Sequence, residues 1–318
     1  MKISFGTRIA SDDISGRNGY GYATQCMLAS LQRLGYTVND NDASADVEIW
    51  FDQPQNWKFR DNQYKIGYLP WESTKLMDGW VEIMNQCDEI WTPSPIVAEW
   101  FKADGITVPV YVYEHGIDHF WQPVVREPEH TIKFLHIGGE AARKGGWDTR
   151  REFKRAFPGN TNVRLTMKLV NSDWINVDTS RVRVINAKYN LKQMRMLFYT
   201  HDVYVYPSHG EGFGLTPLQA IATGMPTITV PDWAPYAKHL DPKLGVEAKL
   251  KAHQWEKIHP GKMWRPNWDD LVDKMRYAAD NYDEVRDTAA SGALDVHRAY
   301  DWDRLTGAAF SALEERLK

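Results

Sequence analysis

The sequence predicts an α/β protein built from two doubly wound domains, each a parallel sheet with helices on both faces. Short apolar runs alternate with helical patterns along the whole chain, as in repeated βαβ units. This alternation breaks once, at the proline-containing segment 121–130, and then restarts. The chain has 318 residues, which is the length of about two domains.

The first domain is expected over residues 1–125 and the second over residues 130–300. In the first, a glycine-rich turn at 15–24 separates the first strand from the first helix, at 24–36. Apolar runs predict strands at 1–9, 47–51, 64–69, 89–94 and 108–116, with further helices at 76–87 and 94–104. In the second domain the same patterns predict strands at 132–139, 163–170, 182–186, 202–208 and 226–231. Helices are expected there at 146–157, 191–200, 215–224 and 269–280, and a last helix at 303–317.

Composition excludes several classes of protein. Hydrophobic residues make up 43% and charged residues 25%, as in ordinary soluble globular proteins. No run of apolar residues is long enough to span a membrane, and the start of the chain turns polar too early for a secretory signal. Cys26 and Cys87 lie far apart, which argues against a zinc site or a disulfide framework and favours a reducing cytoplasm.

Charge is spread unevenly between the two halves. Residues 1–125 hold 9 Lys+Arg and 17 Asp+Glu, a net charge of −8, whereas residues 126–318 hold 29 and 25, a net of +4. A basic second half suits an anionic ligand held mainly by that half. Chance variation of solvated surfaces is the competing explanation.

The most informative segment is residues 203–230, where a predicted strand passes through the turn HGEGFG into a helix. Its three glycines permit positive φ and close backbone approach, and Pro217 suits the first turn of the helix. Free amides at such a start favour a phosphate or another oxygen-rich ligand. Glu211, at the tip of the turn, is placed to accept hydrogen bonds from sugar hydroxyls. The alternative is a plain strand-turn-helix whose glutamate faces water.

This segment resembles the signature of family 4 glycosyltransferases, retaining enzymes of the GT-B fold, in which two Rossmann-like domains face each other across a cleft. Glu211, Phe213, Gly214 and Leu215 match the family pattern. A second glutamate of that pattern, which usually binds the ribose of the nucleotide, is replaced by Gln219. An amide oxygen can accept one such bond but carries no charge.

A second match is HIGGEAARKGGWD, in which Arg143 and Lys144 precede the glycine that opens a helix. The resemblance implies that these cations neutralise the departing diphosphate without a metal. The commoner family form has an arginine where this chain has Gly139. The basic residues of the following helix, at 150, 151, 154 and 155, are better explained as a solvated face.

The first half matches the family less specifically. Gly19 and Gly21 lie in a loop that resembles the family's glycine-rich loop near the donor phosphates. Trp71 and Glu72 stand where many members carry a histidine, which makes them acceptor-cleft candidates, with a structural ion pair as the alternative for Glu72. His115 begins an HGID turn and is a third candidate, although a role in the turn itself is favoured. Residues 301–318 resemble the family's last helix, which crosses back to the first domain.

The resemblance implies transfer of a sugar from a nucleotide donor, such as a UDP- or GDP-sugar, to an acceptor hydroxyl with retention of configuration. Lys144 and Arg143 would stabilise the diphosphate, and Glu211 would orient the sugar. The amides of residues 213–215 would hold donor oxygens, and Gln219 would contact the ribose. No further cofactor is expected, and the acceptor would be bound by the first domain.

Several alternatives remain open at this point. A metal-dependent transferase would use an Asp-x-Asp pair, but 40–42 lies in a polar loop and Asp301 has the pattern of a helix cap. A catalytically silent sugar-nucleotide binding protein and a phosphorylase or epimerase are rivals. The acceptor could be a glycan, a protein, a small molecule or a hydroxymethylated base of DNA. The acidic first half argues against membrane lipids, and a pI near 6.2 lacks the usual nucleic-acid footprint.

Overall fold

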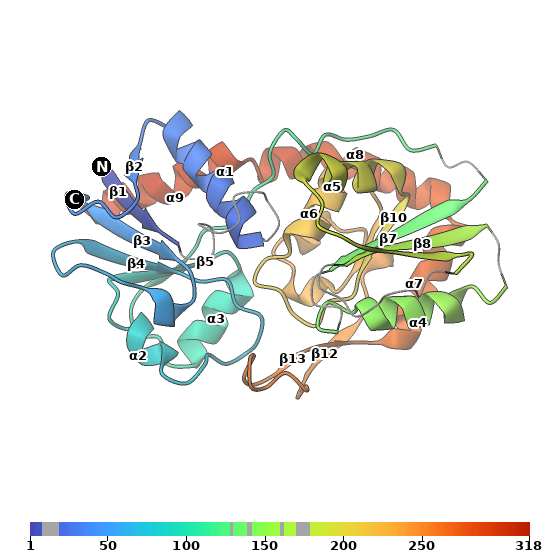
Figure 1. Ribbon diagram of the computed structural model, residues 1–318, viewed down its shortest axis with the longest axis horizontal. Coiled ribbons are helices and arrows are strands. Elements are labelled where there is room, and N and C mark those ends of the chain that lie inside the picture. Colours follow the sequence, from blue (N-terminus) through green and yellow to red (C-terminus); the bar gives the residue numbers. More distant parts are fainter. Residues whose placement is uncertain (8–18, 128–129, 139–141, 160–161, 170–178) are drawn as a thin grey trace.

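The computed structural model describes residues 1–7, 19–127, 130–138, 142–159, 162–169 and 179–318. Two lobes lie side by side along the long axis of the molecule, and each contains its own parallel sheet flanked by helices (Figure 1). The predicted α/β class with two Rossmann-like units is therefore confirmed.

The first lobe contains a six-stranded sheet with the order β2-β1-β3-β4-β5-β6, in which every pair is parallel. Helices cover both faces, because apolar side chains of the central strands point to both sides. One core lies under the first helix, α1 (Gly19–Arg33), and the last helix, α9 (Trp302–Arg316), and the other lies under α2 (Trp80–Met84) and α3 (Pro95–Ala103). The strands are β1 (Lys2–Gly6), β2 (Thr37–Asn39), β3 (Val47–Phe51), β4 (Tyr64–Tyr68), β5 (Glu89–Thr92) and β6 (Val110–Val112), and the helices are α1 (Gly19–Arg33), α2 (Trp80–Met84) and α3 (Pro95–Ala103).

The second lobe contains a five-stranded parallel sheet with the order β11-β10-β7-β8-β9. Its strands are β7 (Ile132–Gly138), β8 (Val163–Leu169), β9 (Val182–Asn186), β10 (Val203–Tyr206) and β11 (Thr227–Thr229). A separate antiparallel hairpin is formed by β12 (Ala248–Lys251) and β13 (Met263–Pro266). The helices are α4 (Gly146–Ala156), α5 (Leu191–Thr200), α6 (Leu215–Ala222), α7 (Trp268–Asp280) and α8 (Tyr282–Ala299). Short 3-10 helices lie at Pro54–Asn56, Pro231–Trp233, Ala237–His239 and Pro242–Leu244.

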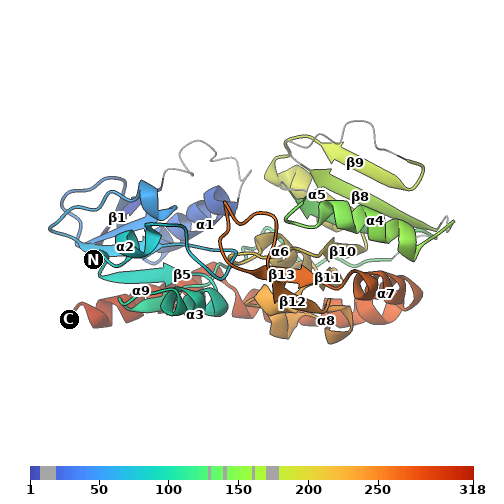
Figure 2. The same ribbon diagram turned by 90° about the horizontal axis from the view of Figure 1, so that it is seen from below.

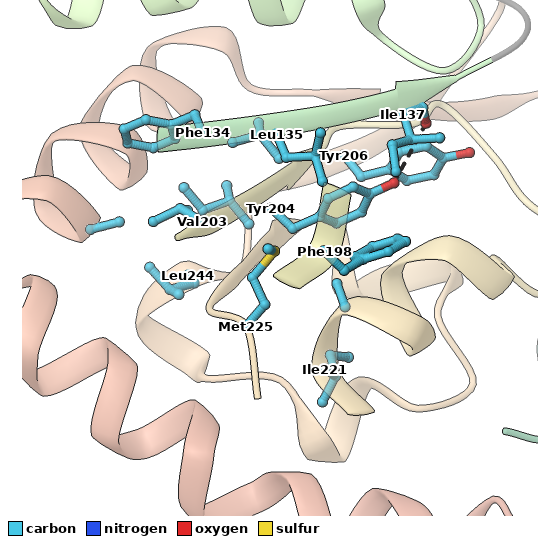
Figure 3. Close-up of a cluster of buried hydrophobic side chains, with 14 of the residues drawn as sticks. Phe134, Leu135, Ile137, Phe198, Val203, Tyr204, Tyr206, Ile221, Met225 and Leu244 are labelled. Atoms are coloured by element: carbon cyan, nitrogen blue, oxygen red, sulfur yellow. Dashed lines mark hydrogen bonds between the residues drawn. The ribbon is translucent and has the colours of Figure 1, made fainter. Parts of the chain in front are cut away.

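The core of the second lobe fixes the two strands that carry the site. Phe134 and Leu135 of β7 pack beside Val203 and Tyr204 of β10 in a fully buried cluster (Figure 3). The Tyr204 hydroxyl donates to Thr216 Oγ1 at 2.9 Å, which ties the strand to the helix that follows it. Because these strands are rigid, the turns at their carboxyl ends have a defined position.

The last helix, α9 (Trp302–Arg316), lies on the first lobe, where it packs against α1 (Figure 1). Arg33 forms an ion pair with Asp303, and Ser30 Oγ donates to the carbonyl of Trp302. Asp301 accepts a bond from the Arg304 amide at 2.8 Å, so it is the helix cap that the sequence predicts.

The chain crosses between the lobes twice, and the two crossing segments are bonded to each other. Residues 113–127 lead from the first sheet to the second, and residues 299–301 lead back from α8 to α9. The amide of Ile117 donates to the carbonyl of Tyr300 at 2.6 Å, and Ile117 and Asp301 form a parallel bridge. The crossings therefore lie side by side.

Four parts of the fold differ from the sequence-based expectation. Helix α1 begins at Gly19, so the part of the predicted glycine-rich turn from residue 19 onward is helical. The short edge strand β2, the polar helix α8 and the β12–β13 hairpin were not predicted. The hairpin loop reaches toward the first lobe (Figure 2), where the Thr74 amide donates to the Lys262 carbonyl at 3.0 Å. No helix of the described part of the chain is long and apolar enough to cross a membrane.

We expect Arg316→Ala to lower the free energy of unfolding by about 1–3 kcal/mol, because it removes the cation from a buried carboxylate. Glu89 is almost completely buried and accepts two bonds from the Arg316 guanidinium, at 2.9 and 3.0 Å. Urea unfolding measures the effect.

The matched control is Arg298→Ala, which removes an arginine whose partner, Asp295, is exposed. This control should change the free energy by less than about 1 kcal/mol. Equal effects of the two substitutions would show that α9 is not held to the first sheet through Glu89.

Candidate functional site

The candidate site lies at the carboxyl ends of neighbouring strands of the second sheet. Strand β10 leads through residues 207–214 into α6, and β7 leads into the turn that precedes α4. Because β7 and β10 are adjacent and parallel, their following turns meet at one edge of the sheet. This arrangement brings Glu211, from the first turn, to Lys144 and Arg143, from the second.

Glu211 is buried, with 8% of its surface exposed, and it points inward. Its Oε1 accepts hydrogen bonds of 2.8 Å from the hydroxyls of Tyr206 and Ser208. The same oxygen lies 3.5 Å from Arg143 Nη1 and 4.0 Å from Lys144 Nζ. Burial alone would raise the pKa of Glu211, but the two cations and two hydroxyls together lower it, so the group is a carboxylate.

Arg143 joins the two turns of the second lobe and also contacts the first lobe. Its Nη1 donates to the carbonyl of Gly210 at 2.6 Å, and its own carbonyl accepts from the His209 amide at 3.0 Å. Its Nη2 lies 3.9 Å from Oε1 of Glu72, which follows β4. The arginine is 5% exposed, so this charge is held in a fixed position.

Two glycines of the HGEGFG turn allow direct contact with the first lobe. A Cβ added at Gly210 would lie 2.2 Å from the carbonyl oxygen of Glu72. A Cβ added at Gly212 would lie 2.5 Å from Cβ of Pro70. The sequence suggested that these glycines permit close backbone approach, and at these two positions the approaching neighbour is segment 70–72 of the first lobe.

The third glycine of this turn, Gly214, precedes α6 in the left-handed conformation, with a φ of 82°. The backbone amides of Phe213, Gly214 and Leu215 donate to no acceptor among the described residues. Gln219 lies further along α6 and is largely buried. Three of the predicted donor-binding groups, residues 213–215, therefore share one helix N-terminus, where unpaired amides favour an anion, and Gln219 lies one turn further along.

Gly19 and Gly21 lie in the first turn of α1 rather than in a loop, which corrects the sequence-based expectation. A Cβ added at Gly19 would lie 3.8 Å from Cδ1 of Leu215. The start of α1 therefore faces the start of α6 across the two lobes, and the first glycine remains next to the candidate donor site.

The acceptor-side candidates occupy different surroundings. Glu72 lies at the boundary between the lobes, where its Oε2 is 3.7 Å from Nδ1 of His259. Trp71 is 3% exposed, packs against Trp80 and donates from Nε1 to the Lys75 carbonyl. The side chain of Trp71 thus belongs to the core of the first lobe. Its ring borders the site toward His259, 5.2 Å between ring centroids, and its backbone nitrogen lies beside Gly212.

His115 is a buried, neutral histidine at the boundary between the lobes. Burial lowers its pKa to about 3, and neither ring nitrogen has a hydrogen-bond partner among the described residues. Its ring lies 5.0 Å from that of Phe213 and 5.8 Å from that of Trp302. It links the end of the first sheet to the HGEGFG turn by ring contacts.

The sequence did not indicate four further residues of this site, which are Tyr20, Tyr206, Ser208 and His259. Tyr206 and Ser208 lie at the carboxyl end of β10, and the available signal was a hydroxyl-bearing residue three or five positions before Glu211. His259 comes from the unpredicted hairpin loop, so nothing in the sequence placed it beside Glu72. Tyr20 lies in the first turn of α1, with its ring 4.9 Å from that of Phe51, and burial, followed by the charges of Glu72 and Asp52, raises the pKa of its hydroxyl.

Neither Asp-x-Asp segment has the geometry of a metal site. Asp42 accepts bonds from the Asn39 side chain and from Ser44, within a local turn. Asp301 is the cap of α9. Over the described ranges, no group of three or more His, Cys, Asp or Glu side chains could hold a metal ion.

Sequence comparison connects the second half of the chain with glycosyltransferases. The model of a family described as "Family 4 Glycosyltransferase in conflict systems" matches residues 158–308. Glycogen synthase from Mycobacterium tuberculosis is 30% identical over 130 residues, which are 38% of this chain and 31% of that protein. The chain thus spans about a third of the length of the curated relatives it matches.

Solved structures show the same fold over nearly the whole chain. Sucrose-phosphate synthase from Thermosynechococcus elongatus superposes with a TM-score of 0.73 and 12% identity, covering 100% of this chain and 99% of that one. The pneumococcal O-GlcNAc transferase GtfA, solved with UDP and GlcNAc, gives a TM-score of 0.59 and 12% identity, covering 80% and 53%. The predicted GT-B fold is confirmed by these likenesses.

We expect Gly210→Ala to destabilise the protein by about 1–3 kcal/mol, because the added methyl group would overlap the Glu72 carbonyl. Gly292→Ala is the matched control, since a Cβ there meets nothing within 4 Å and Gly292 lies inside α8. The control should be neutral or stabilising by up to about 1 kcal/mol. Urea unfolding distinguishes them, and a neutral Gly210→Ala would contradict the close inter-lobe contact.

We also expect Glu211→Gln to reduce the loss of stability in acid. The folded-state pKa of Glu211 is lowered from its ordinary value of 4.5, so its charge contributes stability above pH 4.5. That contribution is lost as the pH falls through the lower folded-state pKa. Unfolding free energies measured across this range should fall less steeply for Glu211→Gln than for the wild type. Glu99→Gln, at an exposed pair with Lys102, should keep the wild-type slope.

Proposed function

We propose that this chain, which resembles family 4 glycosyltransferases and has the GT-B fold, transfers a sugar from a nucleotide-sugar donor to an acceptor hydroxyl. The observation that supports the proposal most strongly is the cluster of Glu211, Arg143 and Lys144 at the start of α6. A carboxylate, two cations and a row of free amides match the two parts of such a donor, a sugar and a diphosphate.

The diphosphate of the donor would lie between the start of α6 and Lys144. The amides of Phe213, Gly214 and Leu215 can donate to phosphate oxygens, and the helix dipole adds to their attraction. Lys144 keeps 26% of its side chain exposed, so its ammonium can leave Glu211 for the phosphate. These groups would stabilise the negative charge that develops on the leaving group, without need of a metal.

Glu211 would position the donor sugar. Its Oε1 is already engaged by Tyr206, Ser208 and the cations, whereas Oε2 makes no hydrogen bond with the described residues. A fixed carboxylate with one open oxygen can accept a bond from a sugar hydroxyl. Transfer with retention follows from the resemblance, with the departing phosphate oxygen taking the proton of the acceptor.

The acceptor would enter between the lobes, on the side of Glu72. The carboxylate of Glu72 contacts Arg143 and His259, and it can exchange the longer of these contacts, 3.9 Å from Arg143 Nη2, for a bond from an acceptor hydroxyl. Burial of the reacting atoms between the lobes would limit attack by water.

Purified protein should release nucleoside diphosphate from one member of a panel of UDP-, GDP-, ADP- and TDP-sugars. Lys144→Ala should lower the turnover by about 100- to 1,000-fold, because it removes charge stabilisation of the leaving group. Glu211→Ala should also lower turnover, through loss of sugar positioning. NMR of the transferred sugar then reports whether its anomeric configuration is retained.

The control is Lys192→Ala on α5, an exposed lysine outside this cluster. Donor binding without any turnover would point to a silent sugar-nucleotide binding protein. Equal turnover of the Lys144→Ala and Lys192→Ala variants would remove Lys144 from the site.

A further inference from the structure

A second concave site lies between α4 and the β12–β13 hairpin. The pocket has a volume of about 480 Å³, and its lining is rich in cations, with Arg151 and Arg155 from α4 and Lys249, Lys251 and Arg265 from the hairpin. Figure 1 shows α4 and the hairpin next to each other in the second lobe. None of these residues belongs to the cluster around Glu211.

The two arginines of α4 have acidic partners. Glu152 is fully buried and accepts bonds of 2.5 Å from both Arg151 and Arg155. Arg155 also binds Asp269, at 2.6 Å. Glu152 and Asp269, from α7, also line the pocket, so they nearly balance the charges of the two arginines of α4.

The three cations of the hairpin have no such partners. Lys249 and Arg265 are directly opposite each other in the antiparallel register, and Lys251 follows two residues later on the same face. No ion pair of the described residues includes any of the three. The remaining acid of the lining, Glu247, lies 3.4 Å from the Asn267 amide. Like charges placed opposite each other destabilise a hairpin, so an anion bound there would stabilise it.

Aromatic side chains adjoin these cations. Trp268 lines the pocket, and the Arg151 guanidinium lies 5.6 Å from its ring centroid. Trp147, one turn before Arg151 on α4, is 50% exposed. Sites for single-stranded nucleic acid typically combine cations along the path of the phosphate backbone with aromatic rings on which bases can stack.

The pocket is connected to the candidate site at both of its walls. Helix α4 begins directly after Lys144 and Gly145. The hairpin is tied to the HGEGFG turn, because the Trp264 amide donates to the His209 carbonyl at 2.8 Å. Lys249 and Lys251 are about 7 Å apart along the strand, a span similar to that between successive phosphates of an extended strand. A chain-like anion lying on the hairpin would therefore lead toward Glu211.

We propose that this pocket binds the sugar-phosphate backbone of a single-stranded nucleic acid, with Lys249, Lys251 and Arg265 holding its phosphates. The strand would carry an acceptor hydroxyl to the neighbouring site, a consequence that rests on the proposed function. The near-neutral pI of the whole chain is compatible with this proposal, because the cations are concentrated on one hairpin.

Fluorescence anisotropy with a labelled single-stranded oligonucleotide, in the absence of any donor, tests the proposal. The double variant Lys249→Glu/Lys251→Glu should bind at least tenfold more weakly at about 50 mM salt. The slope of log K against log salt should fall by about 1.4, the value for two phosphates on a single strand. Arg265→Gln, on β13 opposite Lys249, should also weaken binding of the oligonucleotide.

The matched control is Lys58→Glu/Lys192→Glu, which makes the same change in net charge at two exposed lysines away from the pocket. It should change the affinity less than twofold. The proposal is overturned if the wild type does not bind, if the two double variants bind alike, or if inorganic polyphosphate displaces the oligonucleotide at equal phosphate concentration. Because no donor is present, this result is independent of the test for sugar transfer.

Discussion

The arrangement of the site depends on the burial of one carboxylate. Glu211 sits among aromatic side chains with little access to water, and a charge in such a place must be compensated. Arg143 and Lys144 supply the compensation, and Arg143 also holds the carbonyl of Gly210. The two turns of the second lobe are therefore locked together by the same groups that would meet the donor. A bound diphosphate would add negative charge beside Glu211, and the two cations together with the free amides at the start of α6 would compensate it.

The boundary between the lobes is built at the same place. The backbone of the HGEGFG turn touches the segment that follows β4, and Glu72 reaches Arg143 and His259 from the first lobe. Glu72 and Arg143, two charged groups of this boundary, thus have partners across it. Donor phosphates would compete with Glu72 for Arg143. Binding of a donor to the second lobe would therefore release the Glu72 carboxylate of the first lobe from Arg143.

The sequence predicts the central strands of both sheets well. Strands such as β3 and β7 are buried on both faces, so each one is a short run of mostly apolar residues that is easy to recognise. It does not predict α8. That helix is polar and contains Ser291 and Gly292, and its buried residues are too widely spaced to give a clear helical pattern. The glycines of the HGEGFG turn were recognised, but a sequence cannot tell whether the neighbour that needs the space is a ligand or the other lobe. His259 could not be placed at all, since its approach to Glu72 depends on how two lobes meet.

The paired crossings between the lobes also limit how the molecule can move. The two crossing segments run next to each other, and the bond from the Ile117 amide to the Tyr300 carbonyl joins them. Any movement that pulls one crossing away from the other would have to break this bond and the bridge between Ile117 and Asp301. A change in the angle between the lobes would therefore have to bend both crossings together, next to residues 117 and 300.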